Sequence, residues 1–304
     1  MRIGLVLPTM VPRRPARSLT HWARGAEEAG FSTVAVFDRV VYDSYEPLTA
    51  LAAAAAVTER VSLMTALAIA PLRTNTALFA KQAATVDHLS EGRLVLGLGV
   101  GIREDDFTAG GVPLRGRGAA TDRQLAELRR IWTADADRPD TLGPRPARPG
   151  GVPLVLGGHT PAAIRRAARS ADGWIAGSGG LPVYEHGAGL LEAAWAEEGR
   201  EGKPRTTAVG YFALGRNGAK AAEEYLGAYM AFADPGYTEA VVRSTPTGGE
   251  ALRRTVAAYA SRGCDELLLA PCSAEPEQLE LLAAELDGLL DAVPDRLGDA
   301  VAAG

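Results

Sequence analysis

Short apolar runs alternate with longer amphipathic segments along the whole chain. The apolar runs predict eight strands, at residues 3–7, 33–37, 61–69, 93–98, 152–156, 173–176, 206–214 and 265–270. Segments with helical periodicity follow them, at residues 18–30, 47–58, 74–89, 117–133, 161–170, 184–199, 219–233, 248–262 and 275–290. Strands that alternate with helices in this way pair in parallel.

Eight such units match a (β/α)₈ barrel of the TIM type in number and size, and a doubly wound open sheet is the alternative. Residues 139–153 contain five prolines and form a long loop. This loop could link two domains, but the same rhythm of strands and helices continues on both sides of it. We therefore expect one barrel over residues 1–292 and a frayed, small-residue tail over 293–304.

Composition narrows the class of protein. Apolar residues make up 47% and charged residues 23% of the 304 residues, as in ordinary globular chains. The net charge is −5 and Lys and Arg do not cluster, which speaks against nucleic-acid binding. The apolar runs are too short for a membrane span or a signal peptide. Cys264 and Cys272 lack a CxxC spacing, so we expect a cytoplasmic protein with reduced thiols.

Candidate chemistry gathers where the predicted strands end, because barrel enzymes carry their active sites on that face. The sequence Gly157-Gly158-His159-Thr160-Pro161 leaves a strand and opens a helix. Free N–H groups and the positive end of the helix dipole favour a phosphate there. An ordinary N-cap by Thr160 before Pro161 explains the same residues, and both functions can coexist.

Two further segments at strand ends leave alternatives open. Residues 97–101 read Gly-Leu-Gly-Val-Gly, which does not fit the dinucleotide pattern G-x-G-x-x-G. Such a strand end admits either a flat ligand or tight packing of the protein itself. The acidic run Glu104-Asp105-Asp106 could bind a metal or act in acid–base chemistry, or it could be solvated and cap a helix.

Motifs for other chemistries are absent from the sequence. His21 and His88 fall within predicted helices, and only His159 is on the expected catalytic face. The four histidines do not form HExxH or another metal-ligand spacing, so we predict no metal site. A G-x-S-x-G elbow and a Walker P-loop are also missing, which disfavours hydrolase and nucleotide-kinase activities.

A succession of short motifs resembles a known family. The motifs occupy residues 27–31, 37–38, 80–93, 96–101, 111–118, 156–158 and 165–174. In this order, over roughly residues 1–290, they resemble the bacterial luciferase-like family of flavin- or deazaflavin-dependent oxidoreductases. The resemblance implies a (β/α)₈ barrel, often a homodimer. It also implies a reduced cofactor, FMN or coenzyme F420, that is used as a separate substrate.

The resemblance also implies roles for individual residues. Gly157, Gly158 and Thr160 match the turn that binds the cofactor phosphate, and Arg117 matches a phosphate-contacting arginine. Asp38 lies beside the cofactor ring, and a non-prolyl cis peptide is expected at residues 68–70 behind it. The remaining expected cofactor contacts and ring-lining residues are Ala68, Ile69, Gly99 and His159, with Leu7, Phe37, Leu67 and Trp174.

Arg39 departs from the family pattern, in which a histidine often follows the aspartate. Arginine stays protonated and cannot act as a base near neutral pH. Arg39 could bind an anionic substrate or the reduced ring, or it could form a surface pair with Asp43 or Glu46. The proton-transfer step is then left to the substrate, to water or to His159. The candidate catalytic residues are Asp38, Arg39 and His159.

The expected function is hydride transfer from F420H₂ to a small organic substrate. We prefer F420 because a compact chain of about 300 residues is similar to the deazaflavin members. The alternatives are an FMNH₂-dependent monooxygenase that inserts oxygen from O₂, and a cofactor-less barrel that serves as a partner subunit. Substrate choice is expected to reside in loops at residues 42–45, 102–117, 135–151 and 235–247.

Overall fold

The strands form one closed parallel barrel in the computed structural model, which describes residues 1–135 and 141–290. The strands are β1 (Arg2–Val6), β2 (Thr33–Val36), β3 (Ser62–Thr65), β4 (Ala68–Ile69), β5 (Leu94–Gly99), β6 (Leu154–Gly157), β7 (Gly173–Ala176), β8 (Arg205–Phe212) and β9 (Glu266–Pro271). Their order is β3-β2-β1-β9-β8-β7-β6-β5, and pairing of β3 with β5 closes the ring. The predicted TIM barrel is confirmed and the open sheet is excluded. The expected tail lies outside the described residues.

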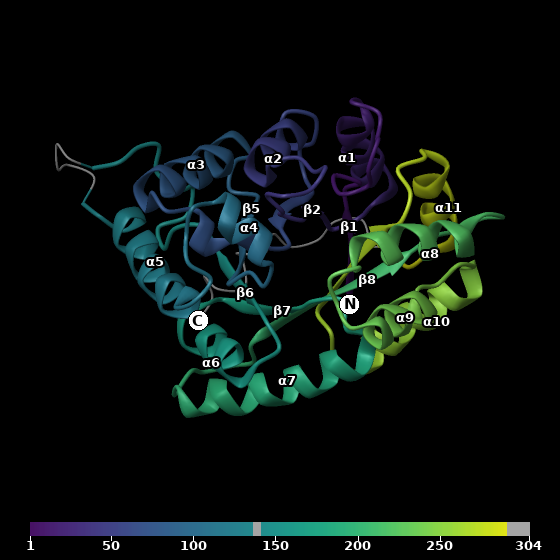
Figure 1. Cartoon of the computed structure of the whole chain (residues 1–304). Helices are drawn as coiled ribbons and strands as arrows, with labels where there is room; N and C mark the ends of the chain where they lie inside the picture. Colours follow the sequence, from purple (N-terminus) through teal and green to yellow (C-terminus); the bar gives the residue numbers. More distant parts are fainter. Residues whose placement is uncertain (136–140, 291–304) are drawn as a thin grey trace.

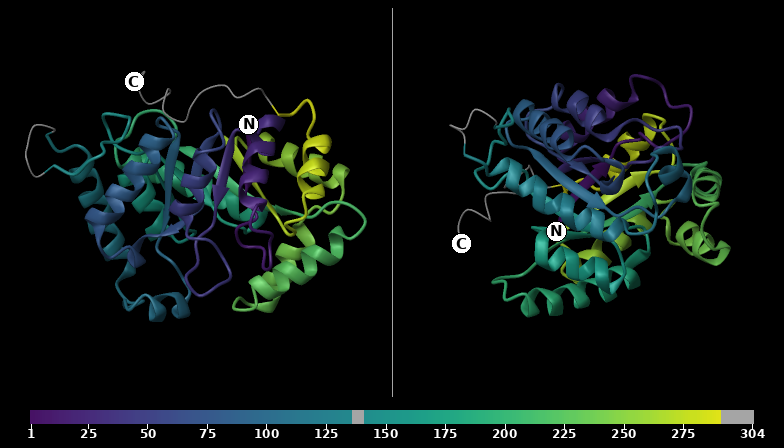
Figure 2. Two further views of the ribbon diagram at one scale, coloured as in Figure 1. Left: turned by 90° about the horizontal axis from the view of Figure 1, so that it is seen from above. Right: turned by 60° about the vertical axis from the view of Figure 1, so that its left-hand side comes forward.

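Helices cover the outside of the barrel (Figure 1). They are α1 (Ser18–Ala29), α2 (Pro47–Ala55), α3 (Thr76–Leu89), α4 (Glu104–Ala109), α5 (Arg117–Trp132), α6 (Pro161–Ser170), α7 (Gly180–Glu197), α8 (Gly218–Tyr229), α9 (Pro235–Ser244), α10 (Gly249–Ser261) and α11 (Glu277–Glu285), with a 3₁₀ turn at Ala70–Leu72. Helices α8, α9 and α10 gather on one side of the barrel (Figure 2).

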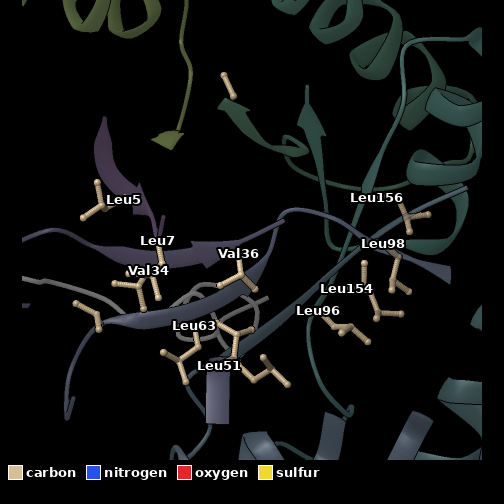
Figure 3. Packing of buried hydrophobic residues seen from close by; sticks show 14 of the residues in the cluster. Leu5, Leu7, Val34, Val36, Leu51, Leu63, Leu96, Leu98, Leu154 and Leu156 are labelled. Atoms are coloured by element: carbon tan, nitrogen blue, oxygen red, sulfur yellow. The ribbon is translucent and has the colours of Figure 1, made fainter. Parts of the chain in front are cut away.

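Alternation along each strand separates two hydrophobic cores, because successive side chains of a strand point to opposite faces. Leu5 and Leu7 face the helices and join a cluster with Leu63, as Figure 3 shows. Val6 faces inward and joins Met64 and the other residues of the barrel interior. The predicted strands are therefore apolar on both faces, as expected for a sheet buried on both sides.

A buried carboxylate closes the amino-terminal end of the barrel. Glu266 accepts hydrogen bonds from the hydroxyls of Ser32 at 2.7 Å and Thr33 at 2.6 Å, and it lies 2.9 Å from the guanidinium of Arg2. These residues come from β1, β2 and β9 or the turn before β2. The opposite, carboxyl-terminal end is the one at which barrel enzymes carry their active sites.

Three segments differ from the sequence-based prediction. The strand predicted at residues 61–69 is interrupted at a cis peptide bond between Ala66 and Leu67, which separates β3 from β4. The acidic run at residues 104–106 begins a helix, α4. The loop predicted at residues 235–247 is largely the helix α9, in which Asp234 caps the N-terminus by accepting from the N–H of Gly236 at 2.9 Å.

Candidate functional site

The carboxyl ends of the strands surround a cavity of about 410 Å³. Its wall consists of residues that end β2, β5, β6, β7 and β8, together with the β3–β4 connection and the ends of α8 and α9. Eight of the ten site residues expected from the sequence line this cavity: Asp38, Arg39, Ala68, Ile69, Gly99, Gly157, Gly158 and His159. A larger cavity of about 570 Å³ lies among α5 and α6 and contains none of the ten. Because active sites of barrels lie at the strand ends, we assign the candidate site to the first cavity.

Asp38 supports the cavity wall that β4 contributes. Its Oδ2 accepts a hydrogen bond from the N–H of Ile69 at 2.8 Å and another from the guanidinium of Arg73 at 2.7 Å. Burial raises the pKa of the Asp38 carboxyl, and the positive charge of Arg73 opposes this rise. Asp38 lies beside the site, as the sequence predicts. Its hydrogen bond to the N–H of Ile69 holds that residue in place.

The alternative of a surface pair between Arg39 and Asp43 or Glu46 is wrong, since both of those carboxylates face other arginines. Arg39 is buried, and its Nε donates to Oδ2 of Asp106 at 2.6 Å. Its terminal nitrogen lies 3.2 Å from Oδ2 of Asp105. Asp105 also lies 2.6 Å from the guanidinium of Arg103. The two carboxylates and the two guanidiniums thus neutralise one another, which leaves little charge at Arg39 to attract an anionic substrate.

Asp106 joins two sides of the cavity mouth. Its side chain is fully buried, and its Oδ1 accepts hydrogen bonds from the N–H groups of Val40 at 2.9 Å and Val41 at 2.7 Å. The expectation that the acidic run is solvated or caps a helix is therefore wrong for this residue. Within the ranges that the structure describes, no group of three or more His, Cys, Asp or Glu residues could hold a metal ion.

Leu67 forms part of the cavity floor and packs against glycines of two neighbouring strands. A Cβ atom at Gly157 would lie 2.0 Å from Cδ1 of Leu67, and one at Gly99 would lie 3.1 Å from it. At Gly97 a Cβ would lie 1.9 Å from the carbonyl oxygen of Thr65. The glycines at this strand end therefore make room for the protein's own residues, Leu67 and Thr65. The cis peptide expected at residues 68–70 is present just before that position, at Ala66-Leu67.

The turn after β6 connects the cavity to the start of α6. Gly158 has a positive φ of 132°, and a Cβ there would lie 2.6 Å from the Cβ of Ala163. Thr160 caps the helix by accepting from the N–H of Ala163 at 3.3 Å, with Pro161 at the first position. The N-cap is thus confirmed. The carbonyl of Gly158 accepts from Nε1 of Trp174 at 2.9 Å.

Two expected cofactor contacts do not line the cavity. Thr160 lies in the turn just outside it. Arg117 begins α5, and its guanidinium donates to the carbonyls of Gly101 at 3.0 Å and Leu114 at 3.2 Å. Gly101 does line the cavity, so Arg117 supports the wall. The phosphate contacts of Arg117 and Thr160 stay predictions.

His159 lies at the cavity edge beside the end of β7. A Cβ at Gly177 would lie 3.2 Å from its Nε2, so the imidazole covers that glycine. One side of His159 is exposed, while partial burial lowers the pKa of the imidazole below its ordinary value. The ring is therefore neutral near pH 7 and can donate one hydrogen bond through one ring nitrogen and accept one through the other.

Several cavity residues were missed by sequence reasoning. Tyr211, on β8, and Tyr229, at the end of α8, form an aromatic side of the cavity. The guanidinium of Arg103 lies 4.2 Å from the ring centre of Phe232, which joins the segment after β5 to the segment after α8. Alternation in the predicted strand 206–214 could have identified Tyr211. No local signal marks the Arg103–Phe232 contact.

Two of the expected ring-lining residues belong elsewhere. Leu7 and Trp174 are fully buried in the core between strands and helices. Each points outward from the barrel because it occupies the outer phase of its strand. Phe37, Leu67 and Ile69 do line the cavity, so its apolar wall is narrower than expected.

Residues 1–302 match the family model described as luciferase-like monooxygenase. The chain belongs to this family. Among the described residues, no helix is both long and apolar enough to cross a membrane. Among the relatives and structural neighbours of this luciferase-like chain are F420-dependent enzymes and one enzyme solved with FMN.

The F420-dependent glucose-6-phosphate dehydrogenase of Intrasporangium calvum is 32% identical over 196 residues, which is 56% of each chain. An F420-dependent secondary alcohol dehydrogenase, solved with an F420-acetone adduct, superposes with a TM-score of 0.78 at 18% identity, covering 97% of this chain and 99% of that one. The oxygenating constituent of 3,6-diketocamphane monooxygenase from Pseudomonas putida, solved with FMN, has a TM-score of 0.73 at 16% identity, with 97% and 99% covered. The chain spans 61% of the length of the curated relatives that it matches at 35% identity.

Proposed function

We propose that this luciferase-like chain is an oxidoreductase that binds reduced F420 and directs a hydride to a small organic substrate. The observation that supports it best is one cavity that joins an apolar wall to a glycine turn at a helix N-terminus. The wall of Phe37, Leu67 and Ile69 suits a flat heterocycle, and the turn at Gly158 suits a phosphate. A bound reduced deazaflavin supplies the hydride. The relative that is an F420-dependent dehydrogenase agrees with this choice.

The fit to a phosphate rests on the closeness of the turn to α6. Because a Cβ at Gly158 would lie 2.6 Å from Ala163, only glycine keeps the turn against the first turn of the helix. An anion beside this turn meets backbone N–H groups and the positive end of the helix dipole. The hydroxyl of Thr160 lies in the same turn.

The protein's own residues position the reactants and provide hydrogen bonds. Asp38 fixes Ile69, and Asp106 fixes the loop after β2, so the cavity wall is held before any ligand binds. A substrate carbonyl that accepts a hydride also needs a proton. His159 is neutral near pH 7, and burial raises the pKa of Tyr211 so that its hydroxyl stays protonated. Both residues line the cavity and can donate a hydrogen bond to that oxygen.

A monooxygenase that uses FMNH₂ and O₂ is the second candidate, and the description of the family model favours it. The cofactor-less partner subunit is disfavoured, because the chain retains both the cavity and the glycine turn. The homodimer expected from the resemblance is likewise a proposal, which light scattering of the purified chain tests.

Turnover under controlled oxygen tests the proposed function. The purified chain is incubated with F420H₂ and a panel of ketones and aldehydes, once without O₂ and once in air. We expect equimolar loss of F420H₂ and formation of alcohol, with the same rate in both atmospheres. Product formation that requires FMNH₂ and consumes O₂ would instead establish the monooxygenase.

A further inference from the structure

The cavity of about 570 Å³ on the outside of the barrel, here called the α5–α6 cavity, has a chemistry of its own. Residues of α5 form one side, and the end of α6, the turn into β7 and the segment after α7 form the other. Among the described residues, none lines both this cavity and the candidate site. A ligand here would therefore be separate from the reactants.

The two helices beside this cavity are strongly basic. Together α5 and α6 contain seven arginines and two acidic residues, a net charge of +5, whereas the whole chain has a net charge of −5. The arginines are spread along the sequence without a basic run, and the fold brings the two helices together (Figure 1). A region of one sign attracts ligands of the opposite sign.

The two carboxylates of the α5–α6 cavity are each paired with one arginine. Oδ1 of Asp122 accepts a hydrogen bond from Nε of Arg166 at 2.7 Å, and Oδ2 lies 3.3 Å from the same guanidinium. Oδ2 of Asp172 accepts from Nη2 of Arg129 at 2.8 Å and from the N–H of Leu154 at 2.7 Å. These two pairs account for the negative charge of the lining.

Two further arginines of the lining have no carboxylate of their own. Arg169 shares Asp122, whose Oδ1 lies 3.2 Å from its Nη2, and 53% of the Arg169 side chain is exposed. Arg200 donates through Nη1 to the carbonyls of Ala168, at 2.9 Å, and Ala171, which caps the end of α6. Its Nε and Nη2 make no hydrogen bond with residues 1–135 or 141–290. The cavity therefore keeps two guanidiniums with unused charge and donors.

Arg200 is held in place and lacks a counter-charge. Its guanidinium lies 3.5 Å from the ring centre of Trp195, a stacking contact that fixes the plane of the group. Burial lowers the pKa of Arg200; Asp172 opposes this fall, and the positive charge of Arg129 adds to it. An anion beside Arg200 would offset both the lost hydration and the repulsion from Arg129.

We propose that the α5–α6 cavity binds a small organic anion with two negatively charged groups, one paired with Arg169 and the other with Arg200. Guanidinium groups match both carboxylates and phosphates, so the ligand class includes either. The lining also contains the apolar Leu125, Ala126 and Ala171, against which a carbon skeleton can pack. The inference goes beyond the proposed function and does not depend on it.

Calorimetric titration of the full chain at low salt and without cofactor tests this inference. The probes are glutarate, with two carboxylates, 3-phosphoglycerate, with a phosphate and a carboxylate, and butyrate, with a single carboxylate. We expect one molecule of glutarate or 3-phosphoglycerate to bind at least about tenfold tighter than butyrate, because each of the two groups meets its own guanidinium. The tighter of the two identifies the preferred group. Binding of neither, or binding no tighter than that of butyrate, would overturn the proposal.

Variants place the anion in the cavity. Arg169→Gln and Arg200→Gln should each weaken binding of the tighter probe by about tenfold. Arg165→Gln is the matched control, since Arg165 is exposed on the same helix as Arg169 and lies outside the lining. Arg200 also caps α6, so urea unfolding checks the fold of that variant, whereas Arg169 is largely exposed. An equal loss in the control would indicate diffuse attraction, and no loss in either cavity variant would put the anion elsewhere, for example at the Gly158 turn. Both results would contradict the inference.

Asp122→Asn gives an effect of opposite sign. The change removes the carboxylate that Arg169 shares with Arg166, so binding of the same probe should tighten by about threefold. A purely structural role of Asp122 would not tighten binding. Affinity that stays the same or falls in a folded Asp122→Asn protein would contradict the assignment of the anion to this cavity.

Discussion

Nε of Arg39 lies 2.6 Å from Oδ2 of Asp106, and the carboxylate is fully buried. This pair connects the loop after β2 to α4, and both segments border the cavity. The other oxygen of Asp106 accepts from two backbone N–H groups of the same loop. Arg39 therefore holds the cavity mouth together through Asp106.

Removal of Asp106 should destabilise the fold strongly. Asp106→Ala leaves the buried guanidinium of Arg39 without its main partner, so the free energy of unfolding should fall by about 3–5 kcal/mol. Asp105→Ala is the control, because that carboxylate is 35% exposed and should cost about 1 kcal/mol or less. Urea unfolding of both variants measures the difference. Equal losses would show that Asp106 is only a surface partner.

Gly157 should not tolerate a methyl group while Leu67 is present. Gly157→Ala places a Cβ 2.0 Å from Cδ1 of Leu67, so we expect a loss of about 1–3 kcal/mol in unfolding free energy. Adding Leu67→Ala should recover part of that loss, and a double-mutant cycle measures the coupling. Gly189→Ala, on an open helix face, should instead stabilise by about 0.5–1 kcal/mol. Strictly additive effects at residues 67 and 157 would contradict the predicted contact.

His159 should titrate below its ordinary range. Its folded pKa is lowered from 6.5, so between 6.5 and that lower value the unfolded chain binds more protons than the folded one. Stability should therefore decrease as pH falls through this window, and His159→Gln should remove that part of the decrease. NMR titration of the imidazole gives the pKa directly. A pKa at or above 6.5 would show that the site does not disfavour the charged ring.

The same histidine should affect turnover more than binding. If His159 donates a hydrogen bond to the reacting oxygen, His159→Phe should lower kcat on the order of tenfold, while His159→Gln retains part of the activity. His88→Gln, in α3 and outside the cavity, is the matched control. Steady-state kinetics with F420H₂ separate kcat from KM. Loss through KM alone would assign His159 to ligand binding.

The repeating architecture could be predicted from the sequence because it depends on local periodicity. Apolar runs of strand length and amphipathic helices recur along the chain, and the barrel confirmed both. The strand broken at Ala66-Leu67 was not predictable from periodicity, since its residues remain apolar throughout. Helix α9 was missed because Pro235 and Gly236 resemble a turn, although Asp234 caps a helix there.

The positions of site residues were easier to predict than their partners. The rule that chemistry lies at strand ends placed Asp38, Arg39 and His159 around one cavity. The partners considered for Arg39 were wrong, because its true partner, Asp106, is 67 residues away and is brought close only by closure of the barrel. Leu7 was likewise misplaced, because a continuous apolar strand does not reveal which phase faces inward.

Anaerobic titration of the purified chain with F420H₂ and FMNH₂ tests the central claim most directly. Fluorescence of Trp174, which donates to the carbonyl of Gly158, reports on the turn that would hold the phosphate. We predict saturable binding of F420H₂ that is tighter than binding of FMNH₂, with a Trp174 signal that Trp174→Phe removes. Tighter binding of FMNH₂ with O₂-coupled turnover, or no binding of either cofactor, would contradict it.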